Sequence, residues 1–394
     1  MTAPAAWGAE VDLDRAIGEL ARRGDVEIPP YPAVALRIER LVAGGDFGLD
    51  ELGRIVQADQ ALAADVLRCA NSAAYARGEP VASLPQAVAR IGAGELSRIA
   101  LASALGGRAL ARGPLASLRR RAWHEAIAAA VLARDLARSR GLPAEDAFAC
   151  GLLHDFGRVL AVECLERLAS GTRTARPMPA RFWEAVVDRQ HLALGALIGE
   201  RWELPAVLVE AITRHHEEAP AGARAPGLLR ILALVDRLVH LLEDRSAVSL
   251  ADVMAVQSLP DAEAAAVLRA VEAVPELVLA FERVAPAGDR SLVAPPARPA
   301  ARAPGEPLRL RVGDASYDVT GFARDQLIAR GSAPLLEGAL LEVELSGPAP
   351  TRFHARVLVS WEDARGRWGV VLMPFALGGA ALLRWHGLAG VAEG

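Results

Sequence analysis

Histidine and aspartate residues that could act together are concentrated in one region of the chain. Six of the eight histidines lie between residues 124 and 240. His154 and Asp155 stand next to each other inside the otherwise apolar stretch GLLHDFGRVL, residues 151–160. The other candidates nearby in sequence are His124, His191, His215, His216 and Asp236. Imidazoles and carboxylates together suit a borderline divalent metal such as Fe, Mn, Co, Ni or Zn, which could supply hydroxide to a phosphoryl centre.

Asp155 is the most informative of these residues. If residues 148–160 form one helix, the apolar side chains make a single stripe and Asp155 lies at its edge. A carboxylate that faces the core is costly unless it is paired or bound to a metal. Gly151 and Gly157 each lower helix stability by about 1 kcal/mol relative to alanine. The glycines therefore indicate either close helix packing or a ligand.

Each candidate also has an ordinary explanation when it is taken alone. His215 and His216 end a predicted helix, where a protonated histidine is favoured by the helix dipole. His191 is typical of a surface or capping histidine, and Asp236 could pair with an arginine. His240 suggests a solvent-exposed or structural residue. The ordered set favours a site more strongly than any single member.

The elements that must position these residues are helices. Helical periodicity predicts an N-terminal extension over residues 1–24 and an all-α domain over 25–285. A linker rich in Pro, Ala and Arg follows over 286–307. Over 308–390 the apolar period changes to two, which predicts a small antiparallel β-barrel closed by a short helix, ALLRWHGL.

Composition excludes several classes of protein. The 394 residues carry a formal net charge of −4, so no basic field favours nucleic acid as a partner. Cys69, Cys150 and Cys164 form no CxxC pair, which is typical of a reducing compartment. The N-terminus is acidic and no long uncharged apolar run occurs, so we expect no membrane span and a cytoplasmic location.

The order His, His-Asp, His, His-His, Asp on successive helices resembles the HD superfamily of metal-dependent phosphohydrolases. The resemblance implies that His124, His154, Asp155 and Asp236 form the basic metal set. It also implies that His191, His215 and His216 are the additional ligands of two-metal members. In a hydrolase Asp155 would be catalytic, and Arg158, at the position of the family's lysine, would contact substrate phosphate. No GYP motif follows His216, so a cyclic di-GMP phosphodiesterase of that subclass is not expected.

A larger part of the helical region resembles the HDOD family. The segments IPPYPAVALRIERLV, LRCANSAAYARGEPVASLPQAVARIGAGELSRIAL and RWELPAVLVEAITRHHE carry this likeness, over about residues 25–240. The resemblance implies a bacterial signal-transduction protein with a mostly non-enzymatic domain that contacts other signalling proteins. The alternative is a metal-dependent phosphohydrolase that acts on a nucleotide or another phosphoester.

The C-terminal region is similar to a PilZ domain, a small barrel that often binds cyclic di-GMP. Arg309, Arg311 and Asp318 are the candidate contacts for this nucleotide, because arginine stacks on guanine and clamps phosphate. The two arginines are two residues apart, whereas the family's element spaces them by four, and no glycine follows Asp318 at the family's spacing. The alternatives are therefore a nucleotide site and a degenerate barrel used for protein contacts.

Overall fold

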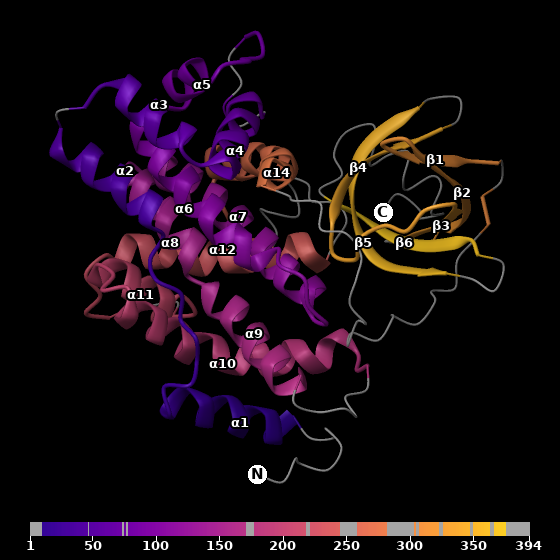
Figure 1. Ribbon diagram of the computed structural model, residues 1–394, viewed down its shortest axis with the longest axis horizontal. Coiled ribbons are helices and arrows are strands. Elements are labelled where there is room, and N and C mark those ends of the chain that lie inside the picture. Colours follow the sequence, from indigo (N-terminus) through magenta and orange to yellow (C-terminus); the bar gives the residue numbers. More distant parts are fainter. Residues whose placement is uncertain are drawn as a thin grey trace.

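The computed structural model describes residues 10–45, 47–72, 75, 78–170, 177–217, 221–244, 258–281, 303–304, 307–322, 326–346, 350–362 and 366–375. Figure 1 shows a helical part and, beside it, a closed barrel of strands. The first helices are α1 (Glu10–Arg22), α2 (Ala33–Gly44), α3 (Leu49–Gln57), α4 (Gln60–Asn71), α5 (Leu84–Ile91) and α6 (Ala93–Ala109). The helices that follow are α7 (Ala116–Ser139), α8 (Ala144–Leu153), α9 (Phe156–Ser170), α10 (Ala180–Arg201), α11 (Ala206–Arg214), α12 (Pro226–Asp244) and α14 (Asp261–Phe281).

Local sequence signals explain how the segment around α4 is built. Asp59 caps α4 by accepting hydrogen bonds from the backbone N–H groups of Ala61 and Leu62. At the other end, the Asn71 amide donates to the carbonyl of Val81 at 2.9 Å and accepts from its N–H at 2.8 Å. These two hydrogen bonds join Asn71, the last residue of α4, to Val81, which lies shortly before α5.

Helix α7 lies at the centre of the helical part and packs against α6, α8, α9, α12 and α14. Trp123, Ile127 and Val131 on this helix are fully buried. Two adjacent pairs, α7 with α8 and α9 with α10, approach each other at glycines. A Cβ atom at Gly151 would lie 2.6 Å from the carbonyl oxygen of Ala129, so α8 can approach α7 only without that atom.

The prediction of one continuous helix over residues 148–160 is wrong. Helix α8 ends at Leu153 and α9 begins at Phe156, and a turn at His154 and Asp155 separates them. The two helices pack against different partners, α8 mainly on α7 and α9 mainly on α10. The apolar side chains of both are nevertheless buried, so the predicted stripe is divided between two helices of one core.

The C-terminal part is a six-stranded antiparallel barrel, which confirms the predicted fold class. Its strands are β1 (Arg309–Val312), β2 (Ala315–Phe322), β3 (Leu327–Gly331), β4 (Leu340–Leu345), β5 (Thr351–Glu362) and β6 (Trp368–Phe375). They close in the order β1-β2-β3-β6-β5-β4. Alternate side chains such as Leu310, Tyr317 and Val343 fill the interior. The predicted helix ALLRWHGL and most of the predicted linker lie outside the described residues.

The barrel rests on the helical part at one side, where β4 contacts α14. Gly338, just before β4, lies so close to α7 that a Cβ atom there would be 3.1 Å from the Cα of Ser117. Leu340 and Phe375 of the barrel belong to the hydrophobic core of the helices. None of the helices in the described ranges is long and apolar enough to cross a membrane.

Candidate metal centre

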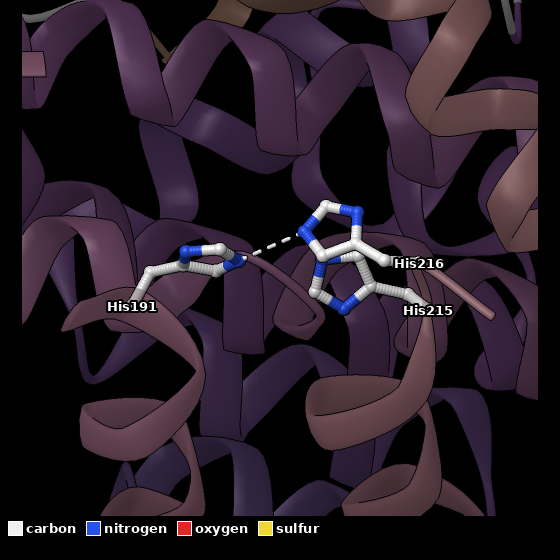
Figure 2. Close-up of side chains that lie close together, drawn as sticks. All are labelled: His191, His215 and His216. Carbon is white, nitrogen blue, oxygen red and sulfur yellow. Dashed lines mark hydrogen bonds between the residues drawn. The ribbon is translucent and has the colours of Figure 1, made fainter. Parts of the chain in front are cut away.

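The junction of α8 and α9 meets α10, α11 and α12 at a buried group of histidines and aspartates. His154 and Asp155 come from the junction, and His191 from the middle of α10. His215 and His216 follow the end of α11, and Asp236 lies on α12. These residues form two sets, and within each set the potential ligand atoms all lie within 4.8 Å of one another. One set is His191, His215 and His216. The other set is His154, Asp155, His215 and Asp236, so His215 belongs to both. Figure 2 shows how His191 faces His216 and how His215 lies beneath it.

The buried imidazoles are held in one orientation by the backbone. Nδ1 of His154 lies 2.8 Å from the carbonyl oxygen of Gly151, and Nδ1 of His191 lies 2.6 Å from that of Asp188. Nδ1 of His215 lies 3.0 Å from the carbonyl oxygen of Ala211. A carbonyl can only accept, so each Nδ1 carries a proton, and Nε2 is the ring nitrogen left to bind a metal. Metal-binding histidines are commonly oriented in this way.

All three Nε2 atoms face the Asp155 carboxylate. The distances are 3.6 Å from His154, 3.4 Å from His191 and 3.3 Å from His215. Among the described residues, Asp155 Oδ1 and His215 Nε2 are buried and have no hydrogen-bond partner. Each unsatisfied buried polar atom costs about 1–3 kcal/mol, and one divalent cation would satisfy both. The donor set therefore fits a divalent transition metal.

Burial and charge set the protonation of this centre. Burial lowers the pKa of His154, and it lowers the pKa of His191 to about 4. Burial acts to raise the pKa of Asp155, but the nearby side chains of His154, Arg158 and His215 outweigh it and hold that pKa well below its usual range. Neutral imidazoles around an ionised carboxylate are the protonation states that a metal requires.

The side of the centre nearer solvent is formed by His216 and Asp236. Nε2 of His216 lies 3.2 Å from Nε2 of His191, and Nδ1 lies 3.4 Å from Asp236. The hydrogen bond to Asp236 raises the pKa of His216. His240, one turn beyond Asp236 on α12, donates from Nδ1 to the carbonyl of Asp236 at 2.7 Å. The i, i+4 spacing from Asp236 is a sequence feature that could have indicated this contact, whereas the sequence analysis gave His240 no role in the site.

Arg158 does not point freely toward solvent. Its Nε donates to Asp155 Oδ2 at 2.7 Å, and its Nη1 donates to Asp188. It also lines a cavity of about 210 Å³ beside the centre. The residues around this cavity are Leu118, Arg121, Ala122, Glu125, Arg158, Val162, Glu184, Val187, Asp188 and His240.

The second arginine of the cavity, Arg121, is held in the same manner. It contacts Glu125 at 2.9 Å and Glu184 at 2.6 Å. Each arginine of the cavity thus lies between two carboxylates. The acidic residues of this cavity carry no recognisable motif, and sequence reasoning missed them.

The remaining predicted site residues are in neither set of ligand atoms among the described residues. His124 is buried on α7, but among the described residues it belongs to neither set of ligand atoms. Arg309 on β1 lies 3.6 Å from Asp318 on β2, and both side chains are exposed. Arg311 contacts Glu344 at 2.8 Å. The three proposed nucleotide contacts are therefore together on one side of the barrel, and both arginines face a carboxylate.

The helical part of the chain matches a known domain family. The family model of the HDOD domain matches residues 28–218, and this part of the chain is an HDOD domain. An "Uncharacterized protein" of Treponema pallidum (strain Nichols) is 28% identical over 224 residues. That match covers 55% of this chain and 43% of the relative, so the chain spans less than half of that relative's length.

Solved structures resemble the helical part of the chain to different degrees. A "Putative metal-dependent phosphohydrolase" from Shewanella amazonensis SB2B is 20% identical, with a TM-score of 0.52, over 69% of this chain and 99% of that one. A "Putative signal transduction protein" from Marinobacter aquaeolei VT8 is 23% identical, with a TM-score of 0.48, over 70% of this chain and 67% of that one. At this level of identity the first likeness shows the fold alone.

The buried histidines predict that the metal-free protein loses stability in mild acid. The unfolded chain binds a proton at position 191 below about pH 6.5, whereas folded His191 does so only near pH 4. Stability therefore falls as the pH drops from 6.5 toward 4, and His191 alone accounts for about 2 kcal/mol between pH 7 and pH 5. His154 acts in the same direction. His216, whose pKa is raised, opposes it.

Urea unfolding of chelator-treated protein at pH 7 and pH 5 measures this loss. The His191→Asn variant is the comparison, because it removes the titrating group. We expect a smaller drop in the free energy of unfolding for the variant than for the wild type. An equal drop in both proteins would show that His191 does not carry the effect.

Proposed function

We propose that the chain is a signal-transduction protein whose HDOD domain holds a divalent transition metal and acts as an interaction module. The observation that carries this proposal is the convergence of three oriented Nε2 atoms on Asp155, whose Oδ1 has no hydrogen-bond partner in the described part of the chain. A bound metal would supply a cross-link between the α8–α9 junction, α10, α11 and α12. Other signalling proteins are the partners that we expect for the resulting surface.

The residues that line the cavity beside the centre favour an interaction module over an enzyme that hydrolyses phosphoesters. A phosphate group would need free cationic donors, yet Arg121 and Arg158 are each already paired with two carboxylates. The cavity wall also carries three carboxylates, of Glu125, Glu184 and Asp188. Their charge disfavours the approach of a phosphate dianion.

A metal-dependent phosphohydrolase is the second candidate function. The observation in its favour is that the cavity reaches Arg158, whose guanidinium contacts the metal-ligand candidate Asp155. In this case the metal would supply a water of lowered pKa. Asp155 would hold the metal, and Arg158 would have to leave Asp188 in order to contact the phosphate.

A turnover assay separates the two functions. Full-length protein loaded with Mn²⁺ or Fe²⁺ is incubated with bis(p-nitrophenyl) phosphate, p-nitrophenyl phosphate and cyclic di-GMP. We expect no hydrolysis above the rate of the Asp155→Asn variant treated identically. Metal-dependent hydrolysis that disappears in the variant would instead establish the phosphohydrolase.

Cyclic di-GMP binding by the barrel stays a prediction, with Arg309, Arg311 and Asp318 as its candidate contacts. The exposed side chain of Arg309 is the feature that supports it. Calorimetric titration of the full chain with cyclic di-GMP tests it, with Arg309→Ala as the variant that should lose the heat of binding.

A further inference from the structure

Asp188 on α10 forms hydrogen bonds with both His191 and Arg158. Its backbone carbonyl accepts a hydrogen bond from Nδ1 of His191 at 2.6 Å. Its carboxylate accepts a hydrogen bond from Nη1 of Arg158. The Asp188 side chain is about half exposed at the wall of the cavity, whereas that of Arg158 is only 13% exposed. The residue therefore connects the solvent-facing cavity with the buried cluster.

Arg158 in turn contacts Asp155. Its Nε donates a hydrogen bond to Asp155 Oδ2 at 2.7 Å. Oδ1 of the same carboxylate then lies 3.4 Å from His191 Nε2 and 3.3 Å from His215 Nε2. The arginine thus fixes which oxygen of Asp155 is free to bind a cation.

We propose that Asp188 is a positioning residue of the metal centre, which anchors and neutralises Arg158 so that Asp155 can act as a ligand. This inference rests on the proposed metal binding. Without the Asp188 carboxylate, the positive charge of Arg158 opposes an arriving cation more strongly. The guanidinium would also be free to take both oxygens of Asp155, because arginine favours bidentate contact with a carboxylate. Both effects weaken metal binding.

The chain offers a matched control for Asp188. Glu184 lies one turn earlier on α10 and lines the same cavity. Its carboxylate contacts Arg121 at 2.6 Å. Glu184→Gln therefore removes one negative charge from the same wall without removing the anchor of Arg158. Asp188→Asn likewise keeps the backbone carbonyl that orients His191.

The experiment is a titration of chelator-stripped full-length protein with Co²⁺, whose visible spectrum reports the ligands around the ion. Asp188→Asn should raise the Co²⁺ Kd about 10-fold or more, within the range found for residues that hold a metal ligand in place, and should change the spectrum. Glu184→Gln should stay within about twofold of the wild type. In the Arg158→Gln background, Asp188→Asn should not raise the Co²⁺ Kd further, because the guanidinium that Asp188 anchors is absent.

The outcomes separate this inference from the metal site itself. If the wild type binds Co²⁺ and Asp188→Asn binds it equally well, the positioning role is overturned and the metal site stands. The positioning role would also be overturned if Asp188→Asn weakened Co²⁺ binding as much in the Arg158→Gln background as in the wild type. The effect of Asp188 would then not depend on Arg158. If the wild type binds no Co²⁺, both the metal site and the positioning role are overturned.

Discussion

Replacing Gly157 by alanine is expected to destabilise the protein by about 3 kcal/mol or more and to weaken metal binding as well. A Cβ atom at this position would lie 2.0 Å from the carbonyl oxygen of His191 and 2.8 Å from the backbone nitrogen of Gly195. Both neighbours are backbone atoms of α10, so no side chain can rotate away. Overpacking commonly costs 1–3 kcal/mol, and a backbone clash places this case at the upper end. Helix α10 must move, and His191 moves with it.

A glycine in open surroundings provides the control. Gly18 lies inside α1, and a Cβ atom there would meet no described atom within 4 Å. Gly18→Ala should therefore be neutral or stabilising by up to about 1 kcal/mol. Urea unfolding of both variants measures the difference. A Gly157→Ala protein as stable as the wild type would contradict the close contact between α9 and α10.

Replacing Asp155 by asparagine is expected to raise the metal Kd by at least about 100-fold. Residues that merely orient a metal ligand change affinity by about 10–100-fold, and Asp155 is proposed to bind the metal itself. Asparagine has nearly the same shape but lacks the charge that the three Nε2 atoms face. Competition titration against a chelator of known affinity measures the change.

Two other variants show whether the loss is specific to Asp155. Asp135→Asn removes an aspartate of α7 that pairs with Arg134 and Arg138. Within the described ranges, Asp135 is in neither set of ligand atoms. The variant should bind metal as the wild type does. His240→Ala should also retain metal binding, because His240 contacts Asp236 but is in neither of the two sets found in the described part of the chain. Equal affinity in Asp155→Asn and the wild type would remove Asp155 from the site.

The sequence order of the histidines and aspartates predicted a group of side chains that the structure brings together, except that His124 is in neither set of ligand atoms among the described residues. Periodicity alone indicated that Asp155 faces the core, and its side chain is buried. The two glycines of GLLHDFGRVL left close packing and a ligand as alternatives. The structure shows close packing at both, against Ala129 and against His191.

Other features depend on packing that the sequence does not display. The ion pairs of Arg158 with Asp188 and of Arg121 with Glu184 join residues 30 and 63 positions apart. Their geometry follows from how α7, α9 and α10 cross, which periodicity does not give. In the barrel, period-two segments predicted strands, but the closing pairs β1–β4 and β3–β6 join strands that are not neighbours in sequence.

The most direct test of the metal centre is the metal affinity of the wild-type chain. Full-length protein purified without a histidine tag is stripped with a chelator and then titrated with Mn²⁺, Fe²⁺ and Zn²⁺, while thermal unfolding is followed in parallel. We expect saturable binding of at least one ion per chain and a higher melting temperature in the bound state, because a ligand that binds only the folded protein stabilises it. Less than about a tenth of an ion per chain, with no change in melting temperature for any of these metals, would contradict the metal centre.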